Sequence, residues 1–264
     1  MIRIGALISG GGTNLAAVMR ACEAGQIDGT VSFVGSDNPQ AAGLEKARAA
    51  GIPTFVVDYR TIIRQCRQAP KERRLPDDFD LTSVHRKTTL FKGHIPPEEA
   101  RAFLSCRAVA EHRLLAEMAA YPFDLLILAG FMRQLTPYFI DRVNTDPTRP
   151  RIMNIHPALL PAFPGVDGYG DTFRYGCKIG GCTVHFIDYG EDTGPIIGQR
   201  AFEILADDTV ETVRQKGLRL EWQLYPECVQ LFAENRLEVK RRLFTLEDGS
   251  QRERMIVVVR RPSA

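Results

Sequence analysis

The feature that most constrains the fold is the regular alternation of apolar and helical segments over the first sixty residues. Apolar runs at residues 2–8, 31–35 and 54–58 are predicted strands, and helical periodicity over residues 15–24 and 41–50 separates them. Short strand–helix–strand connections make successive strands parallel neighbours. The sequence therefore predicts an α/β fold with a doubly wound, mostly parallel sheet and a Rossmann-type N-terminal half.

The second half of the chain extends this pattern. Residues 123–129 and 151–155 are predicted strands, residues 182–188 alternate between polar and apolar as a half-exposed strand does, and residues 195–204 could pair with them. Asp207-Asp208-Thr209 is a helix N-cap signal, and it predicts a long helix that ends near residue 234. The extra strands widen the same sheet.

Two segments interrupt the pattern. Residues 59–104 are charged, contain prolines and show no sustained strand signal, so we expect a partly helical insertion at the periphery of the sheet. A helix predicted over residues 108–120 returns the chain to the sheet. Near the C-terminus, Asp248-Gly249 between two apolar runs predicts a β-hairpin. We therefore expect a domain over residues 1–237 and a hairpin extension over residues 238–264.

The composition excludes several classes of protein. The chain has 264 residues, of which 44% are hydrophobic and 25% are charged, and its net charge is +2. These values are typical of a globular protein and lack the basic excess of a nucleic-acid binder. No apolar stretch reaches the ~20 residues that span a membrane, and the N-terminal apolar run is too short for a signal peptide. The six scattered cysteines predict reduced thiols in a cytoplasmic protein, without the clustering typical of a metal site.

A glycine-rich turn follows the first predicted strand. Gly10-Gly11-Gly12-Thr13-Asn14 joins this strand to a helix, so backbone N–H groups can point at an anion there. The turn is no Walker loop, because no Gly-Lys-Ser/Thr follows, and Leu15 stands where the dinucleotide motif has its last glycine. Phosphate binding and a tight turn that binds nothing both remain possible readings of this segment.

Three polar residues in the second half could transfer an acyl group. Asn154 and His156 alternate at the end of a predicted buried strand, so both side chains can line one cleft. Asp192 lies in a turn-rich segment. An amide can stabilise an oxyanion, an imidazole can move a proton, and a carboxylate can orient the imidazole. Taken singly, each also suits a structural role, and we expect such a role for His185, which lies mid-strand without a polar neighbour in sequence.

Six motifs in order resemble the glycinamide ribonucleotide transformylases, the folate-dependent formyltransferases of purine synthesis. The resemblance covers residues 2–57 and 123–237, and it leaves out the predicted insertion and the C-terminal tail. The matching segments are Ile8-Ser9-Gly10-Gly11-Gly12-Thr13-Asn14-Leu15, Leu128-Ala129-Gly130-Phe131-Met132-Arg133, Asn154-Ile155-His156-Pro157-Ala158-Leu159-Leu160-Pro161, Gly181-Cys182-Thr183-Val184-His185-Phe186, Asp192-Thr193-Gly194-Pro195-Ile196-Ile197 and Glu221-Trp222-Gln223-Leu224-Tyr225-Pro226.

The resemblance implies a formyltransferase whose catalytic residues are Asn154, His156 and Asp192. It implies 10-formyltetrahydrofolate as formyl donor, glycinamide ribonucleotide as acceptor, and no metal. The implied binding residues fall into three groups: Gly12, Thr13 and Asn14 for the phosphate, Glu221 for the ribose hydroxyls, and Leu125, Phe131, Met132, Arg133 and Leu135 for the folate. Small molecules are thus the expected partners of a monomer or homodimer.

One departure from the family leaves the acceptor open. After Pro164-Gly165 the family usually carries a histidine-bearing loop, whereas this chain reads Val166-Asp167-Gly168-Tyr169-Gly170-Asp171. A formyltransferase acting on another amine is therefore one alternative. A formyltetrahydrofolate hydrolase and a non-catalytic folate- or nucleotide-binding homologue are two others.

Overall fold

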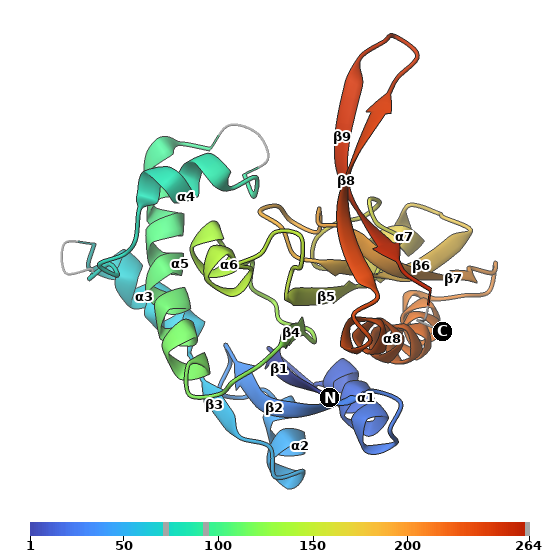
Figure 1. Ribbon diagram of the computed structural model, residues 1–264, viewed down its shortest axis with the longest axis horizontal. Helices are drawn as coiled ribbons and strands as arrows, with labels where there is room; N and C mark the ends of the chain where they lie inside the picture. The colour runs from blue at the N-terminus through green and yellow to red at the C-terminus, as the bar shows by residue number, and fades with distance from the viewer. Residues whose placement is uncertain (71–73, 92–94, 262–264) are drawn as a thin grey trace.

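A seven-stranded sheet organises the chain in the computed structural model, which describes residues 1–70, 74–91 and 95–261 (Figure 1). The strand order is β3-β2-β1-β4-β5-β6-β7. The first five strands are mutually parallel, and β6 and β7 are antiparallel. The strands are β1 (Ile2–Ile8), β2 (Gly29–Ser36), β3 (Thr54–Val56), β4 (Leu125–Leu128), β5 (Ile152–His156), β6 (Ile179–Phe186) and β7 (Ile196–Glu203). The predicted doubly wound, mostly parallel sheet is confirmed.

Side-chain alternation along the strands divides the core between the two faces of the sheet. In β4, Leu125 and Ile127 belong to one buried cluster, whereas Leu126 and Leu128 belong to another. The first cluster is covered by α1 (Thr13–Glu23), α2 (Gly43–Ala49) and α8 (Val210–Ala233), and the second by α3 (Tyr59–Gln68), α5 (Pro97–Met118) and α6 (Pro137–Val143). Strands that are buried on both faces explain the continuous apolar runs in the sequence.

The long C-terminal helix begins where its cap signal predicts. In the capping box of α8, the Thr209 hydroxyl accepts from the Thr212 backbone N–H and the Thr212 hydroxyl accepts from the Thr209 backbone N–H. The helix then packs along the first face of the sheet, where Tyr225 donates to the carbonyl groups of Leu128 and Met153. On the same helix, Glu221 accepts a hydrogen bond from Asn14 of α1.

Residues 59–104 contribute two of the helices, α3 and α4 (Leu81–Lys87), and the start of α5. The helix predicted over residues 108–120 thus begins eleven residues earlier, at Pro97, because proline at the first helical position suits a helix start. Tyr59 and Ile62 are buried in the second core cluster, so part of this segment belongs to the core and does not lie only at the periphery. Residues 71–73 and 92–94 of the predicted insertion lie outside the described residues.

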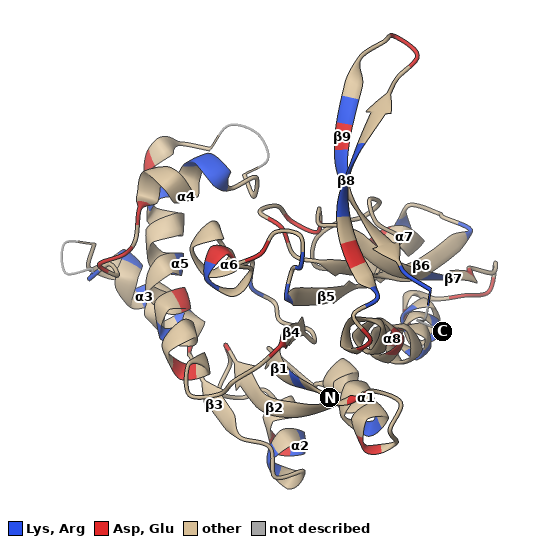
Figure 2. Cartoon of the chain, viewed as in Figure 1, with Lys and Arg blue, Asp and Glu red and all other residues tan. Residues whose placement is uncertain are grey.

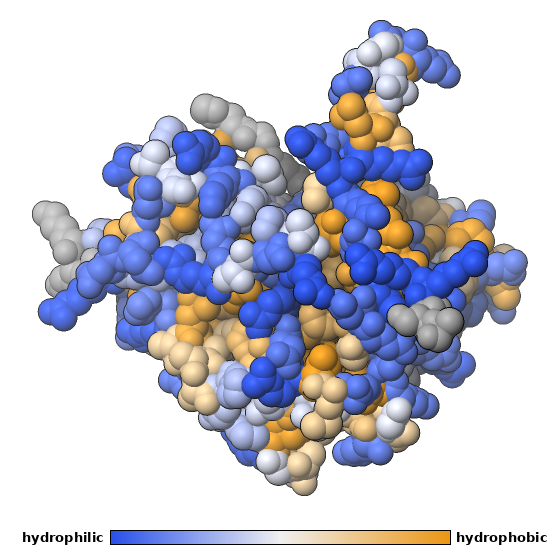
Figure 3. Space-filling view, viewed as in Figure 1, coloured by the Kyte–Doolittle hydropathy of each residue, from blue (hydrophilic) through white to orange (hydrophobic). Residues whose placement is uncertain are grey.

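A two-stranded hairpin of β8 (Leu237–Thr245) and β9 (Gln251–Val259) follows α8 and projects from the body of the protein (Figures 1 and 2). Its position agrees with the hairpin predicted around Asp248-Gly249. Figure 3 shows apolar side chains on the hairpin between hydrophilic ones. Residues 262–264 of the predicted extension are not among the described residues.

Candidate active site

A cavity of about 550 Å³ opens at the carboxyl ends of the parallel strands. This edge is where open α/β sheets bind ligands. Residues from the ends of β4 and β5, from the loop before β7 and from α8 line the cavity. Of the residues predicted from the sequence, it is lined by Asn14, Phe131, Met132, Arg133, Leu135, Asn154, His156, Asp192 and Glu221.

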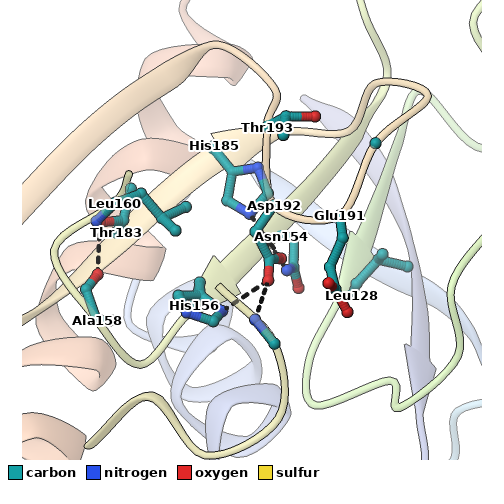
Figure 4. A network of polar contacts seen from close by, with 12 residues as sticks. Leu128, Asn154, His156, Ala158, Leu160, Thr183, His185, Glu191, Asp192 and Thr193 are labelled. Atoms are coloured by element: carbon teal, nitrogen blue, oxygen red, sulfur yellow. Dashed lines mark hydrogen bonds and ion pairs between the residues drawn. The ribbon is translucent and has the colours of Figure 1, made fainter. Parts of the chain in front are cut away.

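Strand β5 presents Asn154 and His156 on the same side, two residues apart. His156 is buried, and its Nδ1 lies 3.3 Å from Asp192 Oδ2, while its Nε2 lies 2.8 Å from the Phe163 carbonyl oxygen (Figure 4). Because both neighbours are acceptors, the two ring nitrogens can each donate only in the imidazolium form. The His156–Asp192 pair thus lines the cavity together with Asn154.

Asp192 is held by an unusual backbone conformation. Its φ is +54°, in the left-handed region that non-glycine residues seldom adopt, and its carboxylate Oδ2 accepts from the Gly165 backbone N–H at 2.9 Å. This single contact ties the turn before β7 to the loop after β5. Asp192 thus approaches His156 from a different segment of the chain.

His185 is a correction to the sequence analysis, which expected a structural histidine without polar partners. Its Nδ1 donates to the Phe186 carbonyl oxygen at 2.9 Å, and its Nε2 lies 3.3 Å from Asn154 Nδ2 and 3.7 Å from Asp192 Oδ1. Burial lowers the pKa of His185, although the charge of Asp192 opposes this shift, so the ring is neutral. The antiparallel pairing of β6 with β5 places it there, opposite Asn154, and a sequence pattern does not reveal that register.

The neutral His185 ring orients the amide of Asn154. Since Nδ1 of His185 carries the proton, its Nε2 is an acceptor, and Asn154 must direct an Nδ2–H group at it. The second Nδ2–H group of Asn154 is left for another acceptor. Asn154 is half-buried and lines the cavity, so this N–H can serve an oxyanion in the cavity.

On another wall of the cavity, Glu221 is a buried carboxylate with two donors. Asn14 Nδ2 donates to its Oε2 at 2.6 Å, and the Tyr169 hydroxyl donates to its Oε1 at 2.6 Å. Burial raises the pKa of Glu221, and these two hydrogen bonds oppose that shift. Asn14 Oδ1 is buried without a hydrogen-bond partner in the described structure. Tyr169 was not predicted as a site residue, and it lies in α7 (Gly168–Arg174), where the sequence analysis noted only an altered loop.

The glycine turn gives α1 an N-terminus without a side-chain cap. Gly12, the N-cap residue, has φ +65°, and a Cβ atom at this position would lie 2.9 Å from Gly43 Cα, so glycine is required. Thr13 is exposed, and Gly12 and Thr13 lie just outside the cavity lining, whereas Asn14 belongs to it. The first N–H groups of α1 are therefore available to an anion beside the cavity.

The segment after β4 forms the wall predicted for folate. Phe131, Met132, Arg133 and Leu135 line the cavity, but Leu125 does not. Leu125 begins β4, pairs with Ile4 and is fully buried in the core, so its predicted contact with folate is wrong. Leu125 stands at the amino end of β4, whereas the cavity lies at the carboxyl end of this strand. The side chain of Leu128, at that end, lines the cavity instead.

Arg133 is fixed by a buried carboxylate. Its Nε pairs with Asp37, which also accepts from the Ser9 hydroxyl at 2.5 Å, and Ser9 Oγ in turn accepts from the Met132 backbone N–H at 2.7 Å. The network joins the ends of β1, β2 and β4. Much of the charge of Arg133 is therefore compensated within the chain.

Arg107, which the sequence analysis missed, differs from Arg133 in this respect. It lies on α5, lines the cavity and packs its guanidinium over the rings of Tyr59 and Phe103. Its buried Nε and Nη1 atoms have no hydrogen-bond partner in the described part of the chain. Burial lowers the pKa of this guanidinium. Arg107 escaped the sequence analysis because it lies in a helix that only the fold brings to the cavity.

Two further findings concern the described residues only. Residues 1–70, 74–91 and 95–261 contain no group of three or more histidine, cysteine, aspartate or glutamate side chains that could hold a metal ion. Within the same ranges, no helix is long and apolar enough to cross a membrane.

Comparisons with known proteins agree on one family. The family model described as formyl transferase matches residues 2–229. The phosphoribosylglycinamide formyltransferase of Bacillus subtilis is 31% identical over 87% of this chain and 94% of its own, and that of Escherichia coli is 32% identical over 88% of both chains. The crystal structure of glycinamide ribonucleotide transformylase 1 from Symbiobacterium toebii covers 99% of this chain and 95% of its own, at 35% identity and a TM-score of 0.69.

Proposed function

The chain belongs to the phosphoribosylglycinamide formyltransferase family, and we propose that it transfers a formyl group from 10-formyltetrahydrofolate to the amine of glycinamide ribonucleotide. The observation that carries this proposal is the joint position of Asn154, His156 and Asp192 at one end of the cavity. An amide donor next to an imidazole–carboxylate pair is the set of groups that acyl transfer between two nitrogens requires.

The reaction proceeds through a tetrahedral intermediate. The amine nitrogen of the acceptor attacks the formyl carbon and forms the new C–N bond, and the formyl oxygen gains a negative charge. The second Nδ2–H of Asn154, which His185 leaves unused, donates to this oxygen, and His156 lines the cavity beside Asn154. When the bond between the formyl carbon and the folate nitrogen breaks, the proton lost by the amine passes to that nitrogen, and the His156–Asp192 pair is the relay.

The acceptor lies on the wall formed by α1 and α8. The uncapped N-terminus of α1, at Gly12, Thr13 and Asn14, suits the phosphate. Glu221 and the unpaired Oδ1 of Asn14 are acceptors for the two hydroxyls of a ribose. The ribonucleotide thereby directs its amine toward Asn154.

The folate lies along the opposite wall, formed by α5 and the segment after β4. Phe131, Met132 and Leu135 offer apolar contacts to the ring system of the donor. The glutamate part of a folate carries carboxylates, which fit the unpaired N–H groups of Arg107 and the outward side of Arg133. We place the enzyme in the cytoplasm, where its six free cysteines would stay reduced.

A different amine as acceptor is the second candidate. The observation that favours it is the segment at residues 166–171, where Asp167 pairs with Arg174 and Arg214 in place of the histidines usual in the family. This replacement changes the charge and the hydrogen-bond donors near the acceptor.

The test is to incubate the purified protein with 10-formyltetrahydrofolate, with and without glycinamide ribonucleotide, and to follow deformylation by absorbance. We expect turnover only with the ribonucleotide, and a loss of two to three orders of magnitude in Asn154→Ala, because one oxyanion donor contributes roughly 3–4 kcal/mol. Deformylation without acceptor would indicate a hydrolase. Folate binding without turnover would indicate another amine or a non-catalytic homologue.

A further inference from the structure

The hydroxyl of Tyr169 donates a hydrogen bond to Glu221, the carboxylate that binds the ribose in the proposed function. Tyr169 Oη donates to Glu221 Oε1 at 2.6 Å, while Asn14 Nδ2 donates to Oε2 at the same distance. Both tyrosine and glutamate are buried, with exposed fractions of 4% and 5%. The contact joins α7 to α8, two segments that the chain separates by 52 positions.

The ring of Tyr169 reaches Glu221 across a glycine of α8. A Cβ atom at Gly217 would lie 2.1 Å from Cζ and 2.3 Å from Oη of Tyr169, so no other residue leaves room for the ring in this position. Glycine inside a helix is unfavourable relative to alanine. Gly217 lies one turn before Glu221 on the same helix, and the opening it leaves in the helix surface is filled by the tyrosine that contacts this carboxylate.

We propose that Tyr169 is a positioning residue that orients Glu221 and thereby sets the affinity of the site for the vicinal hydroxyls of a ribose. This inference rests on the proposed function, and it concerns a position at which the family usually carries the histidine-bearing loop. With one donor on each oxygen, the orientation of the carboxylate is set. Glu221 lines the cavity together with Asn14, whose Oδ1 has no partner among the described residues.

The two donors also favour the ionised form of the carboxylate. Burial raises the pKa of Glu221, and the hydrogen bonds from Asn14 and Tyr169 act against this effect. An ionised carboxylate accepts from a hydroxyl more strongly than a neutral acid does. Removal of the tyrosine hydroxyl should therefore weaken ribose binding without a direct effect on the groups that react.

The experiment compares the wild type with Tyr169→Phe, which keeps the ring against Gly217 and removes only the hydroxyl. We expect the Kd for glycinamide ribonucleotide, measured by calorimetry, to rise about tenfold, because a hydrogen bond to a charged group is worth about that factor. The kcat at saturation and the KM for 10-formyltetrahydrofolate should stay unchanged. Tyr175→Phe is the matched control, since Tyr175 follows α7 and is 81% exposed.

A cycle of ligand and protein changes separates positioning from packing. Analogues that lack the 2′- or the 3′-hydroxyl should bind the wild type more weakly than glycinamide ribonucleotide does. For the analogue that lacks the hydroxyl bound to Glu221, Tyr169→Phe should cause little further loss of affinity. Gly217→Ala, which displaces the ring together with its hydroxyl, should weaken ribose binding at least as much as Tyr169→Phe does.

Three results would overturn the proposal. An equal loss of affinity for all analogues would mean that Tyr169 only supports the fold. A fall in kcat alone would make Tyr169 part of the chemistry, and tighter binding of the ribonucleotide would mean that Tyr169 competes with the ribose.

Ribose 5-phosphate serves as a second probe. If glycinamide ribonucleotide fails to turn over but ribose 5-phosphate binds and depends on Tyr169, the acceptor is wrong and the positioning role holds. If neither ligand binds the wild type, the positioning role fails too.

Discussion

Polar side chains gather at both edges of the parallel sheet, and the two groups differ in how completely the chain pairs them. At the amino edge, Arg3 donates from its backbone and from two side-chain nitrogens to Asp124 at 2.8–3.0 Å. At the carboxyl edge, Asn14 Oδ1 and the Nε and Nη1 atoms of Arg107 are buried without partners in the described structure. The hydroxyl oxygen of Tyr59, which contacts Arg107, is also buried without a partner among the described residues.

From this difference we infer which polar groups stabilise the fold and which are free to contact a ligand. A buried donor or acceptor without a partner destabilises the fold by about 1–3 kcal/mol. Such a group is therefore expected where it has another use, such as binding a ligand. The unpaired groups at the carboxyl edge belong to residues that line or adjoin one cavity. The amino edge, in contrast, satisfies its charges within the chain. The following predictions test this distinction.

The largest effect is expected from Asp192→Asn at the carboxyl edge. The variant keeps the acceptor oxygen for Gly165 but loses the charge that pairs with His156. We expect kcat to fall about a hundredfold to a thousandfold, as for the loss of a positioned acid–base group, with little change in folding stability. Asp188→Asn is the matched control, because Asp188 accepts from Gly190 and Thr193 within the same segment. A similar fall in both variants would show that the turn, and not the charge on His156, is what matters.

A buried acid beneath the carboxyl edge should control stability rather than activity. Glu111 accepts from the backbone N–H and the hydroxyl of Thr136, and burial raises its pKa to about 8. Since this folded-state pKa exceeds the unfolded value, the associated stability is complete below about pH 4.5 and is lost as the pH rises through 8. Glu111→Gln, which resembles the neutral acid, should therefore unfold at nearly the same urea concentration at pH 5 but resist urea better at pH 9. An unchanged pH dependence would mean that Glu111 is ionised in the fold.

Arg107→Met tests the unpaired guanidinium at the same edge. The variant should raise the KM for 10-formyltetrahydrofolate by about tenfold or more, because it removes charge-assisted hydrogen bonds to a carboxylate, and it should leave the KM for the ribonucleotide unchanged. Without ligand it should unfold at a higher temperature than the wild type, since it removes a buried and incompletely paired charge. Arg113→Met on the exposed side of α5 is the control. A loss of stability in Arg107→Met would assign Arg107 to the fold.

The sequence predicts the sheet better than the cavity, for a physical reason. Apolar runs and caps are local signals, and they suffice to identify β1, β5 and the start of α8 at Thr209. The contacts of the site are not local. Arg107 reaches the cavity from a helix whose start was predicted too late, and Tyr169 lies in a short helix that contains two glycines, Gly168 and Gly170, which lower helix propensity.

His185 illustrates the same limit. A strand is correctly predicted here, but β6 is buried on both faces and is not half-exposed as expected. The role of His185 depends on the register between β6 and β5, which pairs it with Asn154. A shift by one residue would turn its side chain to the other face. The joint position of Asn154, His156 and Asp192 at one cavity could be predicted because the family resemblance supplied the long-range information that spacing lacks.

The smallest effect is expected at the amino edge, from Arg3→Met. The hydrogen bonds from Arg3 lower the pKa of Asp124 to about 2, so the stability they provide is present above the unfolded value of 3.8 and is lost as the pH falls through 2. The loss at neutral pH should be small, because both side chains are partly exposed and water and salt screen their charges. Urea unfolding at pH 7 should show this small loss, and the difference from the wild type should shrink as the pH falls through about 2. Both KM values should match those of the wild type. A change in either KM would couple the amino edge to the cavity and contradict the separation of the two edges.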